Sequence, residues 1–216
     1  MAVASGLRYF GRCWFPILGD SLHLPQVQYG FSHPPRSGAL LLSFALLAAV
    51  AMAAEPPKVG EGAVEFKLKT AAGEEVSLSE SRKSGPVVIL VLRGYPGYQC
   101  PICSRQVGQF IAKAEEFEAA GATVIMIYPG PRELLGERAD EFVADQNLPK
   151  RFKLVLDPDY RFTESYGLRW DAPRETAYPS TFVVSEDGKV IFAKVSRTHG
   201  DRTDPKEVLA SLRKSE

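Results

Sequence analysis

Two uninterrupted apolar runs constrain the fold of this 216-residue chain more than any other feature. Residues 87–92 have the sequence Val-Val-Ile-Leu-Val-Leu, and residues 122–128 are almost as apolar. Strands of this kind are typical of a sheet that is covered on both faces. Between the two runs, apolar side chains recur at helical spacing over residues 100–120. The pattern predicts an α/β protein with helices on both faces of a central sheet.

Shorter patterns complete the predicted domain. Residues 63–69 alternate between polar and apolar, and a Gly73 turn separates them from residues 76–78, which predicts an N-terminal β-hairpin. The other expected elements are a helix at 131–147, a short strand at 152–156, a helical turn at 159–166, strands at 181–184 and 190–193, and a last helix that begins after the N-cap Asp204. This order has the pattern of a thioredoxin-like fold with a central mixed β-sheet.

The first 54 residues differ in composition from the rest of the chain. They contain three Arg, one Asp and no Lys, whereas the remaining residues carry 23 basic and 25 acidic side chains. After Arg36, an uncharged apolar run over residues 38–50 leads into small residues, which is the pattern of a secretory signal. About 36 residues precede the run, more than such a signal needs. The near-neutral charge of the whole chain argues against a nucleic-acid partner.

We therefore predict an organisation in three parts: residues 1–54 are a signal peptide or export segment, 55–62 a linker, and 63–216 a single folded domain. The expected location is the periplasm or another extracytoplasmic compartment. An uncleaved membrane anchor is the alternative, although the apolar run is shorter than the roughly 20 residues of a membrane-spanning helix.

Two cysteines of the predicted domain are the strongest functional signal. Cys100 and Cys103 have the spacing C-x-x-C where a buried strand gives way to a helix, a context that gives the motif a redox meaning. Pro101 fits the first helical position, which makes Cys100 the N-cap and places Cys103 in the first turn. The free N–H groups and the dipole at a helix start favour a thiolate. A disulfide that closes so short a loop adds little stability, so its value lies in being made and broken.

Other uses of the cysteines fit the sequence less well. Structural zinc needs four ligands, and beside the two cysteines the predicted domain offers a single histidine, His199. Haem attachment needs C-x-x-C-H, but Ser104 follows the second cysteine. A buried, inert pair or a merely structural disulfide is the remaining alternative. We expect no metal and no cofactor, a solvated His199, and a packing role for Trp170.

These residues together resemble the alkyl hydroperoxide reductase/thiol-specific antioxidant family, the peroxiredoxin-like branch of the thioredoxin superfamily. The resemblance extends from about Gly60 to Leu212. It is carried by residues 92–94, 100–106, 156–159, 166–167 and 179–189. It implies a thiol-dependent enzyme whose partners are a hydroperoxide or a thiol/disulfide redox protein, with a membrane-linked reductant as a further candidate. Because thioredoxin-like proteins have a cis proline beside the cysteine pair, the resemblance also implies a cis Tyr178–Pro179 bond.

The chain departs from the family motif in two ways. Peroxiredoxins carry P-x-x-x-T/S-x-x-C, in which the last Cys attacks the peroxide; here Pro96 and Cys103 are retained and Cys100 replaces the Thr. The family's arginine, which steadies the thiolate and the peroxide, falls at or beside Pro179. Either Arg93 or Arg174 is a candidate to supply the missing guanidinium.

Three functions follow from these patterns. We favour dithiol–disulfide exchange, in which Cys100 attacks, because the N-cap position should leave it the more exposed, and Cys103 resolves the mixed disulfide. The alternative is a thiol peroxidase in which Cys103 forms a sulfenic acid that condenses with Cys100. A non-catalytic thioredoxin-fold binding module is the third possibility. The resemblance adds Pro96, Pro101, Tyr178, Pro179 and Arg93 as residues that bind substrate or shape the site.

Overall fold

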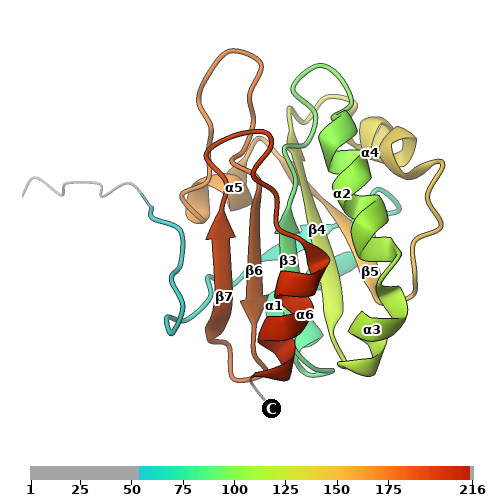
Figure 1. Ribbon diagram of the computed structural model, residues 1–216. Coiled ribbons are helices and arrows are strands. Elements are labelled where there is room, and N and C mark those ends of the chain that lie inside the picture. The colour runs from blue at the N-terminus through green and yellow to red at the C-terminus, as the bar shows by residue number, and fades with distance from the viewer. Residues whose placement is uncertain (1–53, 215–216) are drawn as a thin grey trace, which may run out of the picture. The chain divides into compact units, whose positions relative to one another are not determined.

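A seven-stranded mixed sheet organises residues 54–214, which are the part of the chain that the computed structural model describes (Figure 1). The strands are β1 (Lys67–Lys69), β2 (Glu75–Ser77), β3 (Val87–Val91), β4 (Thr123–Gly130), β5 (Phe152–Pro158), β6 (Ser180–Val184) and β7 (Val190–Val195). Their order across the sheet is β2-β1-β5-β4-β3-β6-β7. Strands β3, β4 and β5 pair in parallel, and the other pairs are antiparallel. The predicted mixed sheet and N-terminal hairpin are confirmed.

Helices cover both faces of this sheet. They are α1 (Leu78–Arg82), α2 (Pro101–Ile111), α3 (Ala114–Ala119), α4 (Leu135–Val143), α5 (Arg161–Ser165) and α6 (Pro205–Arg213). One apolar cluster joins the sheet to α2, α3, α4 and α6, and a second joins the opposite face to α1 and α5. The layers are visible in Figure 1, where α2, α3 and α6 lie in front of the central strands.

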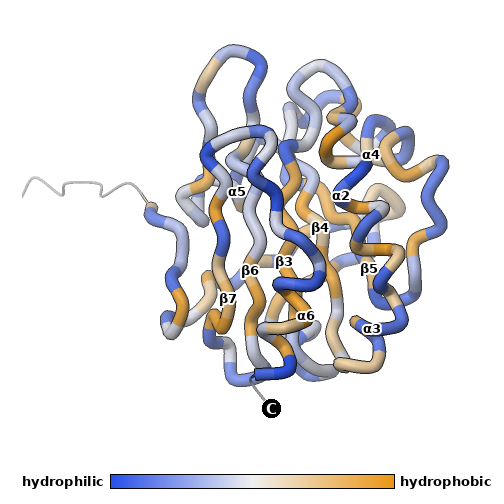
Figure 2. Tube along the Cα trace, in the orientation of Figure 1, coloured by the Kyte–Doolittle hydropathy of each residue, from blue (hydrophilic) through white to orange (hydrophobic). Residues whose placement is uncertain are grey.

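Strand β3 shows why its sequence has no polar residue. All five of its residues are buried, and successive side chains enter opposite clusters: Val88 and Leu90 face α2 and α6, whereas Val87, Ile89 and Val91 face α1 and α5. The central strands are correspondingly hydrophobic in Figure 2, while the loops at their carboxyl ends are mostly polar. The prediction of a strand buried on both faces is confirmed.

The helix predicted over residues 100–120 is two helices. After Ile111 the backbone tightens, because the Lys113 N–H bonds to the carbonyl of Phe110, three residues back, and α3 then begins anew. The break lets the Phe110 and Phe117 rings stack at 5.5 Å between centroids beneath the two helices. The single long helix is therefore wrong, although its start is right.

The C-terminal part of the predicted linker pairs with the β6–β7 hairpin. Gly60 N–H donates to the carbonyl of Val190 (2.8 Å), Val190 N–H donates to that of Glu61 (2.9 Å), and Ala63 N–H donates to that of Gly188 (2.9 Å). Almost all of the predicted export segment, residues 1–53, lies outside the described residues. Among residues 54–214, no helix has the length and apolarity needed to cross a membrane.

Candidate active site

The loop after β3 delivers the cysteines to the edge where the parallel strands end. Leu92 and Tyr95 bond through their N–H groups to carbonyls of β4, Ile127 at 3.0 Å and Pro129 at 2.9 Å. Between them, Gly94 has φ +72°, and a Cβ at this position would overlap the Pro129 carbonyl oxygen. Glycine is therefore needed where the loop turns away from the sheet toward α2.

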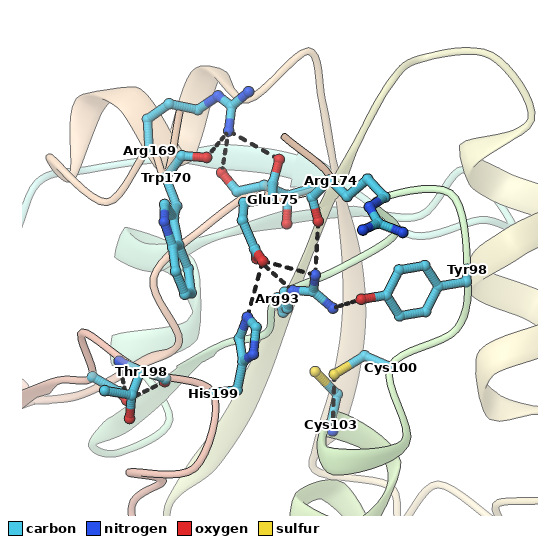
Figure 3. A network of polar contacts seen from close by, with 12 residues as sticks. Arg93, Tyr98, Cys100, Cys103, Arg169, Trp170, Arg174, Glu175, Thr198 and His199 are labelled. Atoms are coloured by element: carbon cyan, nitrogen blue, oxygen red, sulfur yellow. Dashed lines mark hydrogen bonds and ion pairs between the residues drawn. The ribbon is translucent and has the colours of Figure 1, made fainter. Parts of the chain in front are cut away.

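The start of α2 holds both cysteines as predicted from the sequence. Cys100 is the N-cap in extended conformation, its Sγ accepts a hydrogen bond from Cys103 N–H at 3.2 Å, and Pro101 is the first helical residue. Both are free thiols, and their sulfur atoms lie side by side (Figure 3). Cys100 is the more exposed of the two, as expected, but the difference is small: Cys100 is 3% exposed and Cys103 1%, because the loop that contains Arg202 covers the helix start.

The pKa values of the two thiols are shifted in opposite directions. The pKa of Cys100 is lowered to about 6 by a hydrogen bond with the Cys103 side chain, by the Cys103 N–H and by the charges of Arg202 and Arg93, which together outweigh its burial. Burial raises the pKa of Cys103, and its hydrogen bond to Cys100 adds to the rise. The reduced pair therefore has one thiolate, on Cys100, with the Cys103 thiol as its hydrogen-bond donor.

Arg202 supplies the guanidinium that faces the sulfurs. Its Nη2 lies 3.9 Å from Cys100 Sγ and 3.7 Å from Cys103 Sγ. The side chain is held from two sides, by Gln106 Oε1 (3.3 Å from Nη1) and by the carbonyl of His199 (2.8 Å from Nε). No local sequence pattern indicates Arg202, because it approaches from a loop about a hundred residues after the cysteines.

Neither arginine considered from the sequence takes this position. Arg93 is buried, and its guanidinium donates to both carboxylate oxygens of Glu175 (2.6 and 3.1 Å), to Tyr98 Oη (2.7 Å) and to the Arg174 carbonyl (2.7 Å), as Figure 3 shows. Its charge lowers the pKa of Cys100 from a distance. Arg174 contributes its backbone carbonyl to the network. Arg93 is thus in the site as expected, but it holds the surrounding loops together.

His199 links the Arg202 loop to this buried pair. Its Nε2 lies 3.0 Å from Glu175 Oε1, and its ring is 5.0 Å from that of Trp170. Burial tends to raise the pKa of Glu175, but the hydrogen bonds and charges of Arg93 and His199 hold it below the usual value. The expectation of a merely solvated His199 is wrong, although the side chain is 46% exposed.

The Tyr178–Pro179 bond is trans, as are all other peptide bonds of the described residues. The predicted cis bond is wrong. The chain is already extended here: Tyr178 N–H donates to the Leu168 carbonyl, and Ser196 N–H donates to the Pro179 carbonyl, both at 2.8 Å. The Tyr178 ring stacks on Trp170 at 4.8 Å, which confirms the packing role of Trp170. Pro96 is half-buried in the loop between Gly94 and Cys100.

Comparison with known proteins agrees with the fold. The model of the AhpC/TSA family matches residues 59–193. The chain belongs to this family. It is 31% identical over 140 residues to a Mycobacterium tuberculosis protein named "Putative peroxiredoxin", an alignment that covers 62% of this chain and 83% of the relative.

Two further relatives of this AhpC/TSA protein are informative. The thiol-disulfide oxidoreductase ResA of Halalkalibacterium halodurans is 27% identical over 134 residues, 62% of this chain and 66% of ResA. The crystal structure of peroxidoxin BcpB from Mycobacterium tuberculosis superposes with a TM-score of 0.61 at 24% identity, covering 74% of this chain and 99% of that one. The chain therefore has the thioredoxin-like peroxiredoxin fold and is a thiol-dependent oxidoreductase of the AhpC/TSA family.

Proposed function

We propose that this protein is a thiol peroxidase that reduces hydroperoxides with its Cys100–Cys103 pair. The observation that carries the proposal is the Arg202 guanidinium within 4 Å of both sulfurs. Disulfide exchange needs only a low-pKa thiol and a leaving group. Cleavage of an O–O bond also benefits from a fixed cation where negative charge develops on the departing oxygen. Membership of the AhpC/TSA family supports the same reaction.

In the proposed cycle, the Cys100 thiolate attacks the nearer peroxide oxygen. The S–O bond forms as the O–O bond breaks, the thiolate becomes a sulfenic acid, and the second oxygen leaves as an alkoxide or hydroxide that takes a proton from water. The Cys103 thiol then attacks the sulfenic sulfur, which gives the Cys100–Cys103 disulfide and one water. Two electrons from two external thiols or one dithiol, which become a disulfide, return the pair to the reduced state.

Electrostatics and motif assign different attacking cysteines. The family motif places the peroxide-attacking residue at Cys103, because Pro96 lies seven residues before it. The thiolate, however, is favoured on Cys100, whose pKa is lowered to about 6 while that of Cys103 is raised. The thiolate is the nucleophile in such reactions. We therefore assign the first attack to Cys100 and resolution to Cys103.

The two single-cysteine variants test the function and the assignment together. Reduced protein is mixed with hydrogen peroxide, and sulfenic acid is trapped with a dimedone-type reagent and located by peptide mass spectrometry. Cys103→Ser should consume one equivalent of peroxide and carry the adduct on Cys100, whereas Cys100→Ser should react slowly. An adduct on Cys103 in Cys100→Ser, at the wild-type rate, would reverse the assignment. If both variants still consume peroxide like the wild type, the proposed site is refuted. If the wild type itself consumes no peroxide, the proposed function is refuted.

A second function, exchange with protein disulfides, is favoured by the similarity to ResA and by the low pKa of an N-cap cysteine. It predicts that Cys103→Ser captures a protein partner as a mixed disulfide through Cys100. A reduction rate with a model protein disulfide that exceeds the peroxide rate would make exchange the main activity.

We also propose that the protein is exported, on the basis of the apolar run at residues 38–50 and the small residues that follow it. Mass spectrometry of the protein from its native host should find the mature N-terminus near Ala54 or Glu55. An intact Met1 in the cytoplasmic fraction would refute export.

A further inference from the structure

A polar pocket lies beside the cysteine pair and shares Arg202 with it. The pocket has a volume of about 260 Å³ and is formed between α2 and the loop before α6. Its lining residues are Ile102, Arg105, Gln106, Gln109, Gly200, Arg202, Thr203 and Asp204. Because Nη2 of Arg202 contacts both sulfurs, this side chain is the wall between the pocket and the cysteine pair.

Arg105 adds a positive charge to the pocket, where Arg202 is the second cation and Asp204 the single carboxylate; an oxygen of Asp204 accepts the Lys206 N–H at 2.8 Å. The Arg105 side chain is exposed on α2 and makes no ion pair or hydrogen bond with another described residue. The other two arginines near the cysteines are held, Arg93 by Glu175 and Arg202 by Gln106 and the His199 carbonyl. Gln109, one turn further along α2, also has no hydrogen-bond partner among the described residues and adds an amide to the same wall. A carboxylate is the group that an arginine fork and an amide bind best.

We propose that this pocket binds the carboxylate of a low-molecular-weight thiol, and that this thiol reduces the Cys100–Cys103 disulfide. The inference rests on the disulfide formed in the proposed cycle and names the class of reductant that closes it. A pocket of about 260 Å³ accepts a small molecule, with the size of a few amino-acid residues at most.

The charge of the pocket fits the reductant better than the peroxide. Hydrogen peroxide carries no charge that would use Arg105. In the reduced protein the Cys100 thiolate compensates the charge of Arg202, but in the disulfide that thiolate no longer exists. Arg202 is then free to attract an incoming thiolate while Arg105 binds the carboxylate of the same molecule. Cys100 and Cys103 are both buried residues, which further favours a small thiol over a large partner.

The chemistry balances with two thiols. The first thiolate attacks one sulfur of the disulfide, an S–S bond forms between the small thiol and the protein, and the other cysteine leaves as a thiolate. A second thiolate attacks the small-molecule sulfur of this mixed disulfide and releases the second cysteine. Two electrons pass to the protein, and the two small thiols become one disulfide.

Three probes of different charge test the proposal on the oxidised protein: 3-mercaptopropionate is anionic, 2-mercaptoethanol neutral and cysteamine cationic. The disulfide is prepared with diamide, so the measurement does not depend on peroxide activity. Arg105→Glu should slow reduction by 3-mercaptopropionate about tenfold, which corresponds to about 1.4 kcal/mol. Reduction by 2-mercaptoethanol should change less than about twofold, and reduction by cysteamine should not slow. Each probe is compared with itself across variants, so its intrinsic reactivity cancels.

Arg213→Glu is the matched control, because it makes the same charge change at an exposed position near the end of α6. It should leave all three rates within about twofold of wild type. Equal slowing of the three probes by Arg105→Glu, or no effect on any of them, would overturn the carboxylate site. If Arg105→Glu shows the predicted pattern but reduced wild type does not react with peroxide, the proposed function is overturned and the thiol site stands.

Discussion

Helices α2 and α6 begin with the same capping arrangement, but the two helix starts have different chemistry. Each has a capping residue followed by proline at the first helical position, Cys100-Pro101 in α2 and Asp204-Pro205 in α6. In α6, a carboxylate oxygen of Asp204 accepts the N–H of Lys206 at 2.8 Å. In α2, the sulfur of Cys100 accepts the N–H of Cys103 at 3.2 Å. Both caps satisfy an N–H group that the helix itself leaves free.

The surroundings of the two caps account for the difference in chemistry. Asp204 is exposed, and water solvates its charge. Cys100 is buried, where the charge of a thiolate must be stabilised by the protein, and the Cys103 thiol and Arg202 do this. Both residues therefore cap their helix. The cap of α2 is also reactive, because a cation and a second thiol, in place of water, stabilise its negative charge.

Substituting each cap by serine should produce the largest difference. Serine is a good N-cap, so at pH 6, where the Cys100 thiolate adds little stability, Cys100→Ser and Asp204→Ser should each change the free energy of unfolding by less than about 1 kcal/mol. Cys100→Ser removes the proposed nucleophile and should slow peroxide consumption by more than about 10³-fold. Urea unfolding and a peroxide assay measure the two effects. An equal loss of activity in Asp204→Ser would mean that the helix starts do not differ in the proposed way.

Removing the cation should make the α2 cap more like an ordinary thiol. Arg202→Gln should raise the pKa of Cys100 from about 6 and slow the peroxide reaction at pH 7 by about 10²-fold. The pKa is measured from thiolate absorbance against pH. Arg197→Gln is the control in the same loop, because Arg197 lies over the Tyr178 ring, 4.5 Å from its centroid, and has no sulfur contact. A Cys100 pKa that stays near 6 in Arg202→Gln would assign the acidity to the hydrogen bonds from Cys103 and the charge of Arg93.

Local features of this site could be predicted from the sequence. The apolar run at 87–92, the C-x-x-C spacing and Pro101 fix β3, the N-cap and the first turn through short-range geometry, and the structure agrees. The Asp204-Pro205 start of α6 is predicted for the same reason and is also confirmed. Each of these depends on residues only a few positions apart.

The missed features depend on contacts between distant segments. Arg202 contacts the sulfurs from a loop about a hundred residues further along the chain. Arg93 forms an ion pair with Glu175, which is 82 residues further along the chain. The near-complete burial of both cysteines depends on the loop that contains Arg202, which the sequence does not place over the helix start. The cis Tyr178–Pro179 bond was expected from the resemblance, whereas the structure has a trans bond at this position.

The lowered pKa of Cys100 should also appear in the stability of the reduced protein. Its pKa in the folded state, about 6, lies below the ordinary thiol value of 9.0 that applies when the chain is unfolded. The unfolded state therefore binds more protons between these values, and stability rises as the pH increases from 6 to 9. The contribution is fully present above pH 9 and is lost as the pH falls through 6. Denaturant midpoints of reduced wild type and Cys100→Ser across this range measure it, and parallel curves would contradict the assignment.

The smallest effect should come from His199, which acts on the α2 site through the position of Arg202. Its Nε2 bonds to Glu175 and its carbonyl accepts from Arg202 Nε, so its side chain ties the Arg202 loop to the buried Arg93–Glu175 pair. His199→Ala removes this tie but leaves the carbonyl, and should slow the peroxide reaction about fivefold, in line with roughly 1 kcal/mol for one hydrogen bond. The pKa of Cys100 should rise in the same variant, a change that lost stability alone would not cause. His199→Gln, whose amide can still donate to Glu175, should restore most of both values. A slower reaction with an unchanged Cys100 pKa, or no recovery in His199→Gln, would show that the loop does not control the cation at the cysteine pair.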